Sequence, residues 1–321
     1  MGNTFGTHFR LTTYGESHGL AVGGILDGCP AGLRVDMEAL GRDLARRRTG
    51  TVDGTTARRE EDSVEFHAGI LDGVTLGTPI AFGIKNRDYR PEDYDLLADA
   101  YRPGHADYTY QAKYGIRDHR GGGRASARET VARVVAGAIA KQVVAPVAIA
   151  AEVETLGPEA ANDTRGGTVR CRITGLRAGV GEPVFDKLGA RLAQAMMSIP
   201  SAIGFEMGAG FAAARMIGSE YIDRWNADGT TRTNHCGGVQ GGISNGMPVE
   251  FRVAFHPVAT LPTEVECLTE GGTLRPTLVG GRHDRCQVTR ATVIVEAMAA
   301  LTLADLMEGR CRRADIDGLT N

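Results

Sequence analysis

The chain has 321 residues, and 44 of them are glycine. This is roughly twice the ~7% glycine content usual for soluble proteins. The remaining composition, 42% apolar and 23% charged, is ordinary and excludes a collagen-like or disordered chain. With 36 basic and 39 acidic residues, the net charge of −3 gives no general electrostatic reason to bind nucleic acid or an anionic membrane. We therefore expect a globular protein in which any anion-binding site is local.

The cysteine pattern and the apolar segments indicate a cytoplasmic protein. The six cysteines show neither CxxC pairs nor zinc-finger spacing, so we interpret them as reduced thiols. The N-terminal residues lack the basic start and apolar run of a signal peptide. The most apolar window, 134–153, contains Lys141, Gln142 and Pro146, so we expect no membrane span.

The first predicted helix follows Asp36, which is a suitable N-cap residue. The helix is expected to run to about Arg48, because Met37, Leu40 and Leu44 recur on one helical face. It should end at the following Thr-Gly pair.

Two further helices are predicted at 126–139 and 183–197. The first of these begins with a capping box, in which Ser126 and Glu129 would satisfy each other's backbone N–H groups. The second has a proline suited to the first turn, and its spacing places Phe185 on the buried face.

Alternating apolar and polar residues at 169–173 and 249–255 predict half-buried strands of antiparallel sheets. A further helix at 294–307 is apolar nearly all round, so it should be central. Residues 158–167 are the expected surface excursion. Because we find no internal repeat of 20–50 residues, we expect one α+β domain covering residues 1–321.

The glycines gather beside polar residues. Four clusters of this kind occupy residues 15–19, 121–124, 237–242 and 280–284. Glycine permits positive φ and close approach of a ligand to the backbone, although any single cluster is more simply a tight turn. The strongest case is 121–129, where three glycines and Arg124 precede a helix N-terminus that would favour a phosphate. The segment matches neither a Walker loop nor a Rossmann fingerprint.

Two histidines and one His-Asp pair are candidates for proton transfer, because only histidine has an unperturbed pKa near neutrality. His18 lies among glycines and His105 follows a Pro-Gly pair, and either could instead be structural. Asp284 shares one turn with the cation of Arg282. A nucleophilic pair of Ser17 with His18 is not expected, because adjacent side chains rarely converge and no GxSxG elbow is present. No metal site is expected, since HExxH is absent.

Taken in chain order, these segments resemble the chorismate synthase family nearly end to end. The matching motifs include Gly15-Glu16-Ser17-His18-Gly19, Arg46-Arg47-Arg48, 102–110, 120–124, Ser126-Ala127-Arg128-Glu129-Thr130, 181–186, 280–284 and Glu296-Ala297-Met298-Ala299. The resemblance implies an α+β fold with antiparallel sheets in a core surrounded by helices, and a homotetramer.

The resemblance also implies a reaction. A lyase of this family uses reduced FMN (FMNH2) to remove the 3-phosphate and the C6 hydrogen of 5-enolpyruvylshikimate 3-phosphate, giving chorismate for aromatic amino acid biosynthesis by the shikimate pathway. The flavoprotein supplies orientation and charge, while the cofactor supplies the difficult chemistry. We find no additional reductase domain, so we expect an external flavin reductant.

Roles follow from the resemblance position by position. His18 and His105 would handle protons, Asp284 would relay a proton from flavin N5, and Ser17 and Ser126 would support these groups. The expected substrate-binding residues are Arg47, Arg102, Arg128 and Arg282, whose guanidinium groups suit carboxylates and phosphate. The expected cofactor-binding residues are Arg124, Ala125, Ser126, Pro200, Ser201, Gly241, His256, Pro257, Val258, Ala259, Thr260 and Arg282.

Several positions depart from the family pattern. Asp53 stands where relatives have an arginine, and residues 256–260 read His-Pro-Val-Ala-Thr instead of Lys-Pro-Thr-x-Ser. Ile203 and Arg285 also replace the family residues, and the excursion before residue 163 is shorter than in relatives. Two alternatives therefore stay open: a paralogue that performs the same elimination on a related shikimate-derived phosphate, and a non-catalytic flavin- or phosphate-binding protein.

Overall fold

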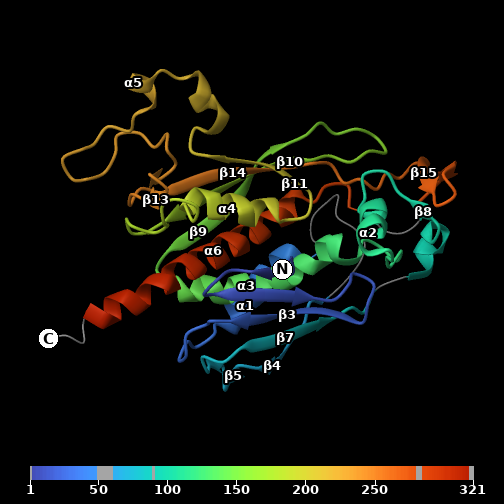
Figure 1. Ribbon diagram of the computed structural model, residues 1–321, viewed down its shortest axis with the longest axis horizontal. Helices are drawn as coiled ribbons and strands as arrows, with labels where there is room; N and C mark the ends of the chain where they lie inside the picture. Colours follow the sequence, from blue (N-terminus) through green and yellow to red (C-terminus); the bar gives the residue numbers. More distant parts are fainter. Residues whose placement is uncertain (1, 49–60, 89–90, 280–283, 318–321) are drawn as a thin grey trace.

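Two antiparallel sheets form the outer layers of the structure, and helices fill the space between them (Figure 1). The structure is a computed structural model, which describes residues 2–48, 61–88, 91–279 and 284–317. The five-stranded sheet has the order β1 (Thr4–Phe5), β2 (Arg10–Tyr14), β3 (Ala21–Asp27), β7 (Ile80–Lys85) and β4 (Val64–Ala68). The four-stranded sheet has the order β11 (Ala202–Met207), β14 (Val249–Phe255), β10 (Gly167–Thr174) and β9 (Ala148–Leu156).

The helices are short except for the last. They are α1 (Met37–Arg47), α2 (Asp107–Tyr114), α3 (Thr130–Val143), α4 (Leu188–Met197), α5 (Gly218–Tyr221) and α6 (Val288–Asp317), with 3-10 turns at Pro91–Leu97, Gly123–Ala125, Ala127–Glu129 and Gly210–Arg215. Small sheets pair β5 (Ile70–Leu71) with β6 (Val74–Thr75), β12 (Val239–Gln240) with β13 (Ile243–Ser244), and β16 (Leu274–Thr277) with β15 (Val265–Thr269) and β8 (Ala100–Tyr101).

The α+β class and the antiparallel pairing are confirmed, but the order of the layers differs from the expectation. Helix α3 packs on β2 and β3, α6 packs on β9 and β10, and the two helices pack against each other. The helices therefore lie between the sheets of this chain instead of around them. The reason is that α6 is apolar nearly all round, and only a central position covers every side of it.

Both strands predicted from alternation are confirmed. Val169 of β10 lies opposite Val253 of β14, and Cys171 lies opposite Phe251. All four of these side chains are buried, because they point toward the helices, while the intervening arginines point outward.

Helix α1 matches its prediction, including the cap: the Asp36 Oδ1 accepts a hydrogen bond from the Ala39 N–H at 2.8 Å. Leu40 and Leu44 are buried as expected. Met37, predicted on the same helical face, is 46% exposed because it lies at the first position of the helix.

The predicted capping box does not form. Ser126 Oγ instead accepts from the Arg128 N–H at 3.2 Å and caps a 3-10 turn, and α3 begins only at Thr130. The Glu129 carboxylate accepts from Thr13 Oγ1 at 2.8 Å and from Arg133 Nε at 2.9 Å. The Glu129 carboxylate therefore bonds the side chains of Thr13 and Arg133 instead of the backbone N–H of Ser126.

Helix α4 begins at Leu188, five residues later than predicted, and Phe185 is 90% exposed. The residues before Leu188 form turns and bends that pack near Gly242 instead of continuing the helix. Helix α6 begins six residues before the predicted 294, and its side chains are mostly buried from Val288 to Asp305. Of the surface excursion predicted at 158–167, residues 158–163 are exposed, but Gly166 is buried and β10 begins at Gly167. A longer excursion at 208–238, which the sequence patterns did not indicate, contains α5 and projects from the structure (Figure 1).

The buried carboxylate of Asp305 connects the start of the chain to α6. It accepts hydrogen bonds from the backbone N–H groups of Thr7 and Phe9 at 2.7 and 3.0 Å, and from Arg191 Nη2 at 2.7 Å. The start of the chain, α4 and α6 are thereby held at one point, next to the first residue of β2, and the other end of β2 reaches the site described below.

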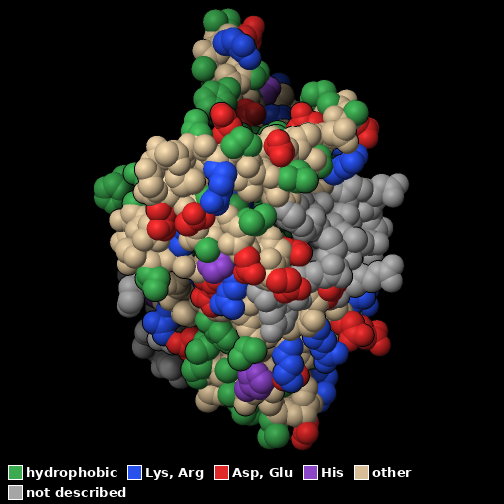
Figure 2. Space-filling view, turned by 90° about the vertical axis from the view of Figure 1, so that its right-hand side faces the viewer, with side chains coloured by type: hydrophobic (Ala, Val, Ile, Leu, Met, Phe, Trp, Pro, Cys, Tyr) green, Lys and Arg blue, Asp and Glu red, His purple; other side chains and the backbone are tan. Residues whose placement is uncertain are grey.

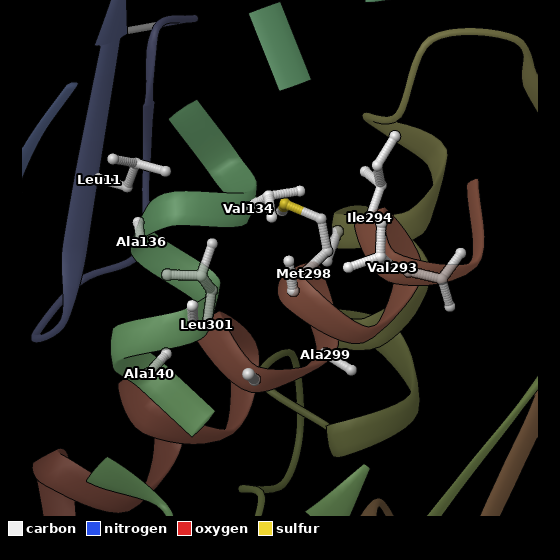
Figure 3. Packing of buried hydrophobic residues seen from close by; sticks show 14 of the residues in the cluster. Leu11, Val134, Ala136, Ala140, Val293, Ile294, Met298, Ala299 and Leu301 are labelled. Atoms are coloured by element: carbon white, nitrogen blue, oxygen red, sulfur yellow. The ribbon is translucent and has the colours of Figure 1, made fainter. Parts of the chain in front are cut away.

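The contact between α3 and α6 depends on a residue without a side chain. Figure 3 shows side chains such as Val134 on α3 and Met298 on α6 pointing toward one another across this contact. A Cβ added at Gly137 would overlap the Cβ of Ala297 and would lie 2.5 Å from its Cα. The two backbones therefore approach as closely as glycine permits.

We predict that Gly137→Ala lowers the free energy of unfolding by about 1–3 kcal/mol, because the new methyl group meets helix backbone that cannot shift alone. Gly41→Ala is the matched control. Gly41 lies on the exposed face of α1, with nothing within 4 Å of an added Cβ. This change should therefore stabilise the protein by about 0.4–1 kcal/mol. Urea unfolding of both variants measures the difference, and a Gly137→Ala variant as stable as the parent would contradict the packing argument.

Candidate active site

A cavity of about 1210 Å³ collects residues from segments far apart in the chain. The end of β2, the starts of α3 and α6, and the loops at 198–201 and 256–260 all contribute to its wall. Ligand pockets usually measure ~300–1,000 Å³, so this cavity has room for more than one small ligand. Figure 2 views the end of the molecule where α2 and β8 lie, and charged side chains of both signs gather there around histidine.

The cavity wall is positively charged although the whole chain is negative. Its described lining includes seven arginines and five carboxylates, namely Arg47, Arg102, Arg117, Arg124, Arg128, Arg133 and Arg290 against Glu16, Asp62, Asp107, Asp118 and Asp284. A local excess of cations in a low-dielectric wall favours anionic ligands.

Most of the predicted site residues meet in this cavity. Its wall contains His18, His105, Ser126, Asp284, Arg47, Arg102, Arg128, Arg124, Ala125, Pro200, Ser201, His256, Val258, Ala259 and Thr260. Ser17 is buried directly behind His18, and Pro257 lies between two lining residues. Arg282 lies outside the described residues, as does Asp53.

Gly241 is placed differently from the other predicted cofactor residues. It lies in the turn between β12 and β13 and is not among the residues that line the cavity. Its φ of +60° accounts for a glycine at this turn without a ligand. Within a single chain, the cavity is therefore built without the predicted contribution of Gly241.

Ser17 and His18 converge, contrary to the expectation for adjacent residues. Ser17 Oγ lies 3.0 Å from His18 Nδ1, and the His18 ring meets the Tyr94 ring edge-on at 4.8 Å. A Cβ at Gly121, whose φ is +70°, would lie 2.9 Å from Ser17 Oγ and would overlap the His18 ring. The first glycine of the triple-glycine loop therefore makes the space in which this pair is held.

His105 is held by both ring nitrogens. Its Nδ1 lies 2.9 Å from the Pro103 carbonyl, and its Nε2 lies 2.9 Å from Thr260 Oγ1. A carbonyl only accepts, so Nδ1 carries the proton of the neutral ring, and Nε2 accepts from the threonine hydroxyl. The hydroxyl that ends the divergent 256–260 segment is therefore in use at a histidine that lines the cavity.

Arg102 is fixed by Asp107. Its Nε and Nη2 donate to the two Asp107 oxygens at 2.8 and 2.9 Å, and Nη2 also donates to the Gly121 carbonyl at 2.8 Å. Burial alone would raise the pKa of Asp107, but the hydrogen bond and charge of Arg102 outweigh it and lower that pKa.

Arg47 and Arg128 share one buried carboxylate. Arg47 Nη1 donates to Asp62 Oδ2 at 2.9 Å, Arg128 Nη1 donates to Asp62 Oδ1, and Arg128 Nε donates to Asn86 Oδ1 at 2.8 Å. Burial alone would raise the pKa of Asp62, but the charges of Arg47 and Arg128 hold it below its ordinary value. Burial also lowers the pKa of Arg47 to about 10, Asp62 opposes that change, and Arg128 and Arg290 add to it. Arg47 nevertheless stays charged at neutral pH.

Arg124 is directed toward strand β2. Its Nη2 donates to Thr13 Oγ1 at 2.6 Å, and its Nη1 donates to the Gly15 carbonyl at 3.1 Å. Arg124 thus connects the triple-glycine loop to the end of β2, in addition to facing the cavity.

The sequence patterns missed several residues that build this wall. The lining residues among them are Asp62, Asp107, Arg133, Gln287 and Arg290, and Asn86 holds Arg128 from outside the lining. Asp107 lies in the 102–110 motif, so the predicted role of Arg102 in the same motif could have pointed to Asp107 as its partner. Asp62 has no local signal, because its partners Arg47 and Arg128 are distant in sequence. Arg290 has none either, because its partner Asp284 lies in a segment without helical periodicity.

Asp284 forms an ion pair with Arg290 on the first turn of α6. Close by, Gln287 Nε2 donates to Ser201 Oγ, so the start of α6 contacts the loop that was predicted to hold cofactor. Within the described residues, no three His, Cys, Asp or Glu side chains are grouped to bind a metal ion, and no helix has the length and apolarity to cross a membrane.

Comparison with known proteins gives consistent matches. The family model described as chorismate synthase matches residues 9–162 and 148–307. A chorismate synthase from Christiangramia forsetii is 50% identical, with 95% of this chain and 97% of the relative covered, and one from Flavobacterium psychrophilum is 48% identical over 95% and 96%. A crystal structure of chorismate synthase superposes with a TM-score of 0.73 at 28% identity, covering 97% of this chain and 98% of that chain.

We predict that Asp62→Asn destabilises the protein by about 3–5 kcal/mol at neutral pH, because two buried guanidinium groups lose their shared counter-charge. The folded-state pKa of Asp62 lies below its ordinary value of 3.8. Its stabilising effect is therefore complete well above pH 3.8 and is lost as the pH falls through the folded-state pKa.

Urea unfolding of parent and variant at several pH values tests this prediction. The gap between them should be constant from pH 8 to about 5 and should narrow only in acid. Glu65→Gln is the matched control: it removes the carboxylate of an exposed pair between Glu65 on β4 and Lys85 on β7, and it should change stability little. An Asp62→Asn variant as stable as the control would contradict a buried counter-charge role.

Proposed function

The chain belongs to the chorismate synthase family, and on that basis we propose that it is a chorismate synthase. The reaction is the 1,4-elimination of phosphate and the C6 hydrogen from 5-enolpyruvylshikimate 3-phosphate, without net redox change. The observation that carries the proposal is the large, arginine-rich cavity in which the predicted histidines, serine and aspartate meet. The substrate has a phosphate and carboxylates, so it requires several local cations in a chain whose net charge is −3.

The cavity fits reduced FMN together with the substrate. Its volume of about 1210 Å³ exceeds the usual room for one ligand. Glycine backbones reach the wall at positive φ, and a Cβ at Gly104 would lie 3.0 Å from the Ala259 Cβ. Residues 124–126, 200–201 and 256–260 are those proposed to hold the flavin. When bound, reduced FMN would lend electron density to the breaking C–O bond and provide N5 as a proton acceptor.

The chain's own residues orient the ligands and move protons. We assign proton handling to His105, whose Nε2 accepts from Thr260 Oγ1, and to His18, whose Nδ1 is paired with Ser17 Oγ. Asp284, which precedes α6 and pairs with Arg290, would provide a carboxylate that accepts a proton beside the bound flavin. Arg47, Arg102 and Arg128 are held in fixed orientations by Asp62 and Asp107, so the cations are in place before an anion arrives.

We further propose a cytoplasmic homotetramer supplied by an external flavin reductant. The five cysteines whose side chains are described are free thiols, which suits a reducing compartment. Large apolar side chains are exposed on the projecting 208–238 segment, with Phe211 79% and Trp225 54% accessible, as on surfaces that pack against another subunit. Sedimentation analysis of the purified protein tests the tetramer, and a monomer at all concentrations would contradict it.

The decisive test is an anaerobic assay of the purified protein with photoreduced FMN and 5-enolpyruvylshikimate 3-phosphate. We expect chorismate absorbance and free phosphate to rise together in equal amounts. Tight FMN binding without turnover would replace the proposal with the paralogue alternative, since the flavin site would be intact and the substrate wrong. Absence of flavin binding would contradict both enzymatic functions and favour a phosphate-binding protein.

We predict that His105→Ala and Asp284→Ala each lower turnover by about 10²–10⁴-fold, the range of general acid–base catalysis, while changing FMN affinity much less. Single-turnover rates and flavin titration separate the two quantities. His67→Ala is the control, because His67 is exposed on β4 and lies outside the cavity lining. Full turnover in either cavity variant would refute the role assigned to that residue.

A further inference from the structure

Arg290 is a buried arginine of the cavity wall to which neither sequence patterns nor the family resemblance assigned a role. It lies on the first turn of α6, is 6% exposed, and pairs through Nη2 with Asp284. Among the described residues, its Nε has no hydrogen-bond partner although that atom is buried. An arginine that is buried with donors unused carries a free-energy cost that a bound acceptor would remove.

Arg290 also lines a second, small cavity, as do Arg47 and Gln287. The small space of about 20 Å³ is lined by Arg47, Thr130, Gln287 and Arg290, among others. A water molecule needs roughly 10–15 Å³ of such volume, so this space accommodates about one water and excludes a phosphate. Of these two spaces beside Arg290, only the large cavity has room for a ligand anion.

The charges around Arg290 do not cancel. We define the buried arginine cluster as Arg47, Arg128 and Arg290, whose carboxylate partners are the buried Asp62 and the partly buried Asp284. Within the part of the chain that the structure describes, three cations face two anions in this cluster, which leaves one positive charge in excess. The mutual repulsion is visible at Arg47, where burial, followed by the charges of Arg128 and Arg290, lowers the pKa to about 10 against the opposing effect of Asp62. An uncompensated buried charge is unfavourable, so the cluster favours an additional anion.

The N-termini of α3 and α6 reinforce this field. The same small space is lined from both helix starts. Ala127 and Thr130 contribute at the beginning of α3, and Gln287 and Arg290 contribute at the beginning of α6. Both helices are longer than eight residues, and the partial positive charges of their N-terminal ends add to that of the guanidinium groups.

We propose that Arg290 is a positioning residue that provides the excess positive charge of the buried arginine cluster, so that an oxyanion of the ligand, phosphate or carboxylate, binds beside Asp284. Asp284 compensates only part of that charge and is held at the wall by the same guanidinium group. The inference rests on the proposed function only in linking this anion site to proton transfer by Asp284. The anion site itself stands on the charges, burial and cavity described above.

Binding of inorganic phosphate alone tests the proposal without any turnover. Titration calorimetry at constant ionic strength would compare the parent with Arg290→Gln, Arg290→Lys and Asp284→Asn. We expect Arg290→Gln to weaken phosphate binding at least about tenfold, the loss of one charge-assisted contact, and Arg290→Lys to restore most of it. Asp284→Asn should tighten phosphate binding severalfold, because it removes an opposing carboxylate and leaves Arg290 in place.

Arg191→Gln is the matched control. Arg191 resembles Arg290 in pairing with a carboxylate of α6, Asp305 at 2.7 Å, and in having a buried Nε without a hydrogen-bond partner among the described residues. It does not line the cavity. Both arginine-to-glutamine changes should lower stability, but only Arg290→Gln should weaken phosphate binding.

Parallel titrations identify the anion that uses the site. Succinate tests a carboxylate, and FMN compared with riboflavin tests the flavin phosphate. If Arg290→Gln weakens FMN binding but not riboflavin binding, the anion is the flavin phosphate. If the variant binds both flavins as tightly as the parent but binds phosphate and succinate more weakly, the anion is an oxyanion of the substrate. Unchanged phosphate affinity in Arg290→Gln, or weaker phosphate binding in Asp284→Asn, overturns the proposal.

Two measurements keep the test decisive if one variant misfolds. Should Arg290→Gln fail to fold, Asp284→Asn and Arg290→Lys still give opposite expectations for phosphate affinity. A parent protein that binds phosphate through Arg290 but forms no chorismate would refute the proposed function and leave the anion site intact. In an active protein, Arg290→Lys should raise KM for the substrate more than it lowers kcat, which a purely structural role would not produce.

Discussion

The close contact of α3 with α6 is the constraint on which the rest of the structure depends. At Gly137 there is no room for a methyl group against the backbone of Ala297, so the two helices meet at the closest possible distance. Each helix then covers one sheet, and the starts of both helices line the same cavity wall. Two N-terminal helix ends and the arginines beside them are thus brought together by packing alone, before any ligand is considered.

The second determining feature is that four arginines of the cavity are held by carboxylates of the same chain. Asp62 orients Arg47 and Arg128, Asp107 orients Arg102, and Asp284 pairs with Arg290. Because these guanidinium groups are already fixed, a bound anion does not have to order long side chains. The carboxylates also limit the positive charge, so that the protein tolerates the cluster and still attracts a ligand anion.

The departures from the family pattern are compatible with an intact wall at the positions the structure describes. Thr260 retains a hydroxyl that bonds His105 Nε2, and His256 lines the cavity where relatives carry lysine. Arg285 is exposed and accepts a backbone hydrogen bond from Arg165 at its carbonyl, and Ile203 is exposed on edge strand β11. Ile203 and Arg285 therefore lie at the surface, and His256 and Thr260 keep polar groups in the cavity, whereas Val258 and Ala259 line it without a hydroxyl.

Sequence patterns alone determined what depends on neighbours in the chain. Examples are the cap of α1 by Asp36, the alternation of β10 and β14, and the apolar α6. The motif resemblance also brought forward most of the cavity's residues. Local patterns misjudged Phe185 and the capping box at Ser126, where long-range packing overrides local preference. Only the tertiary structure decided that helices lie between the sheets, that Asp62 serves two arginines, and that Arg290 completes a positive cluster. Those contacts join residues far apart in the chain or in irregular segments, and no periodicity records them.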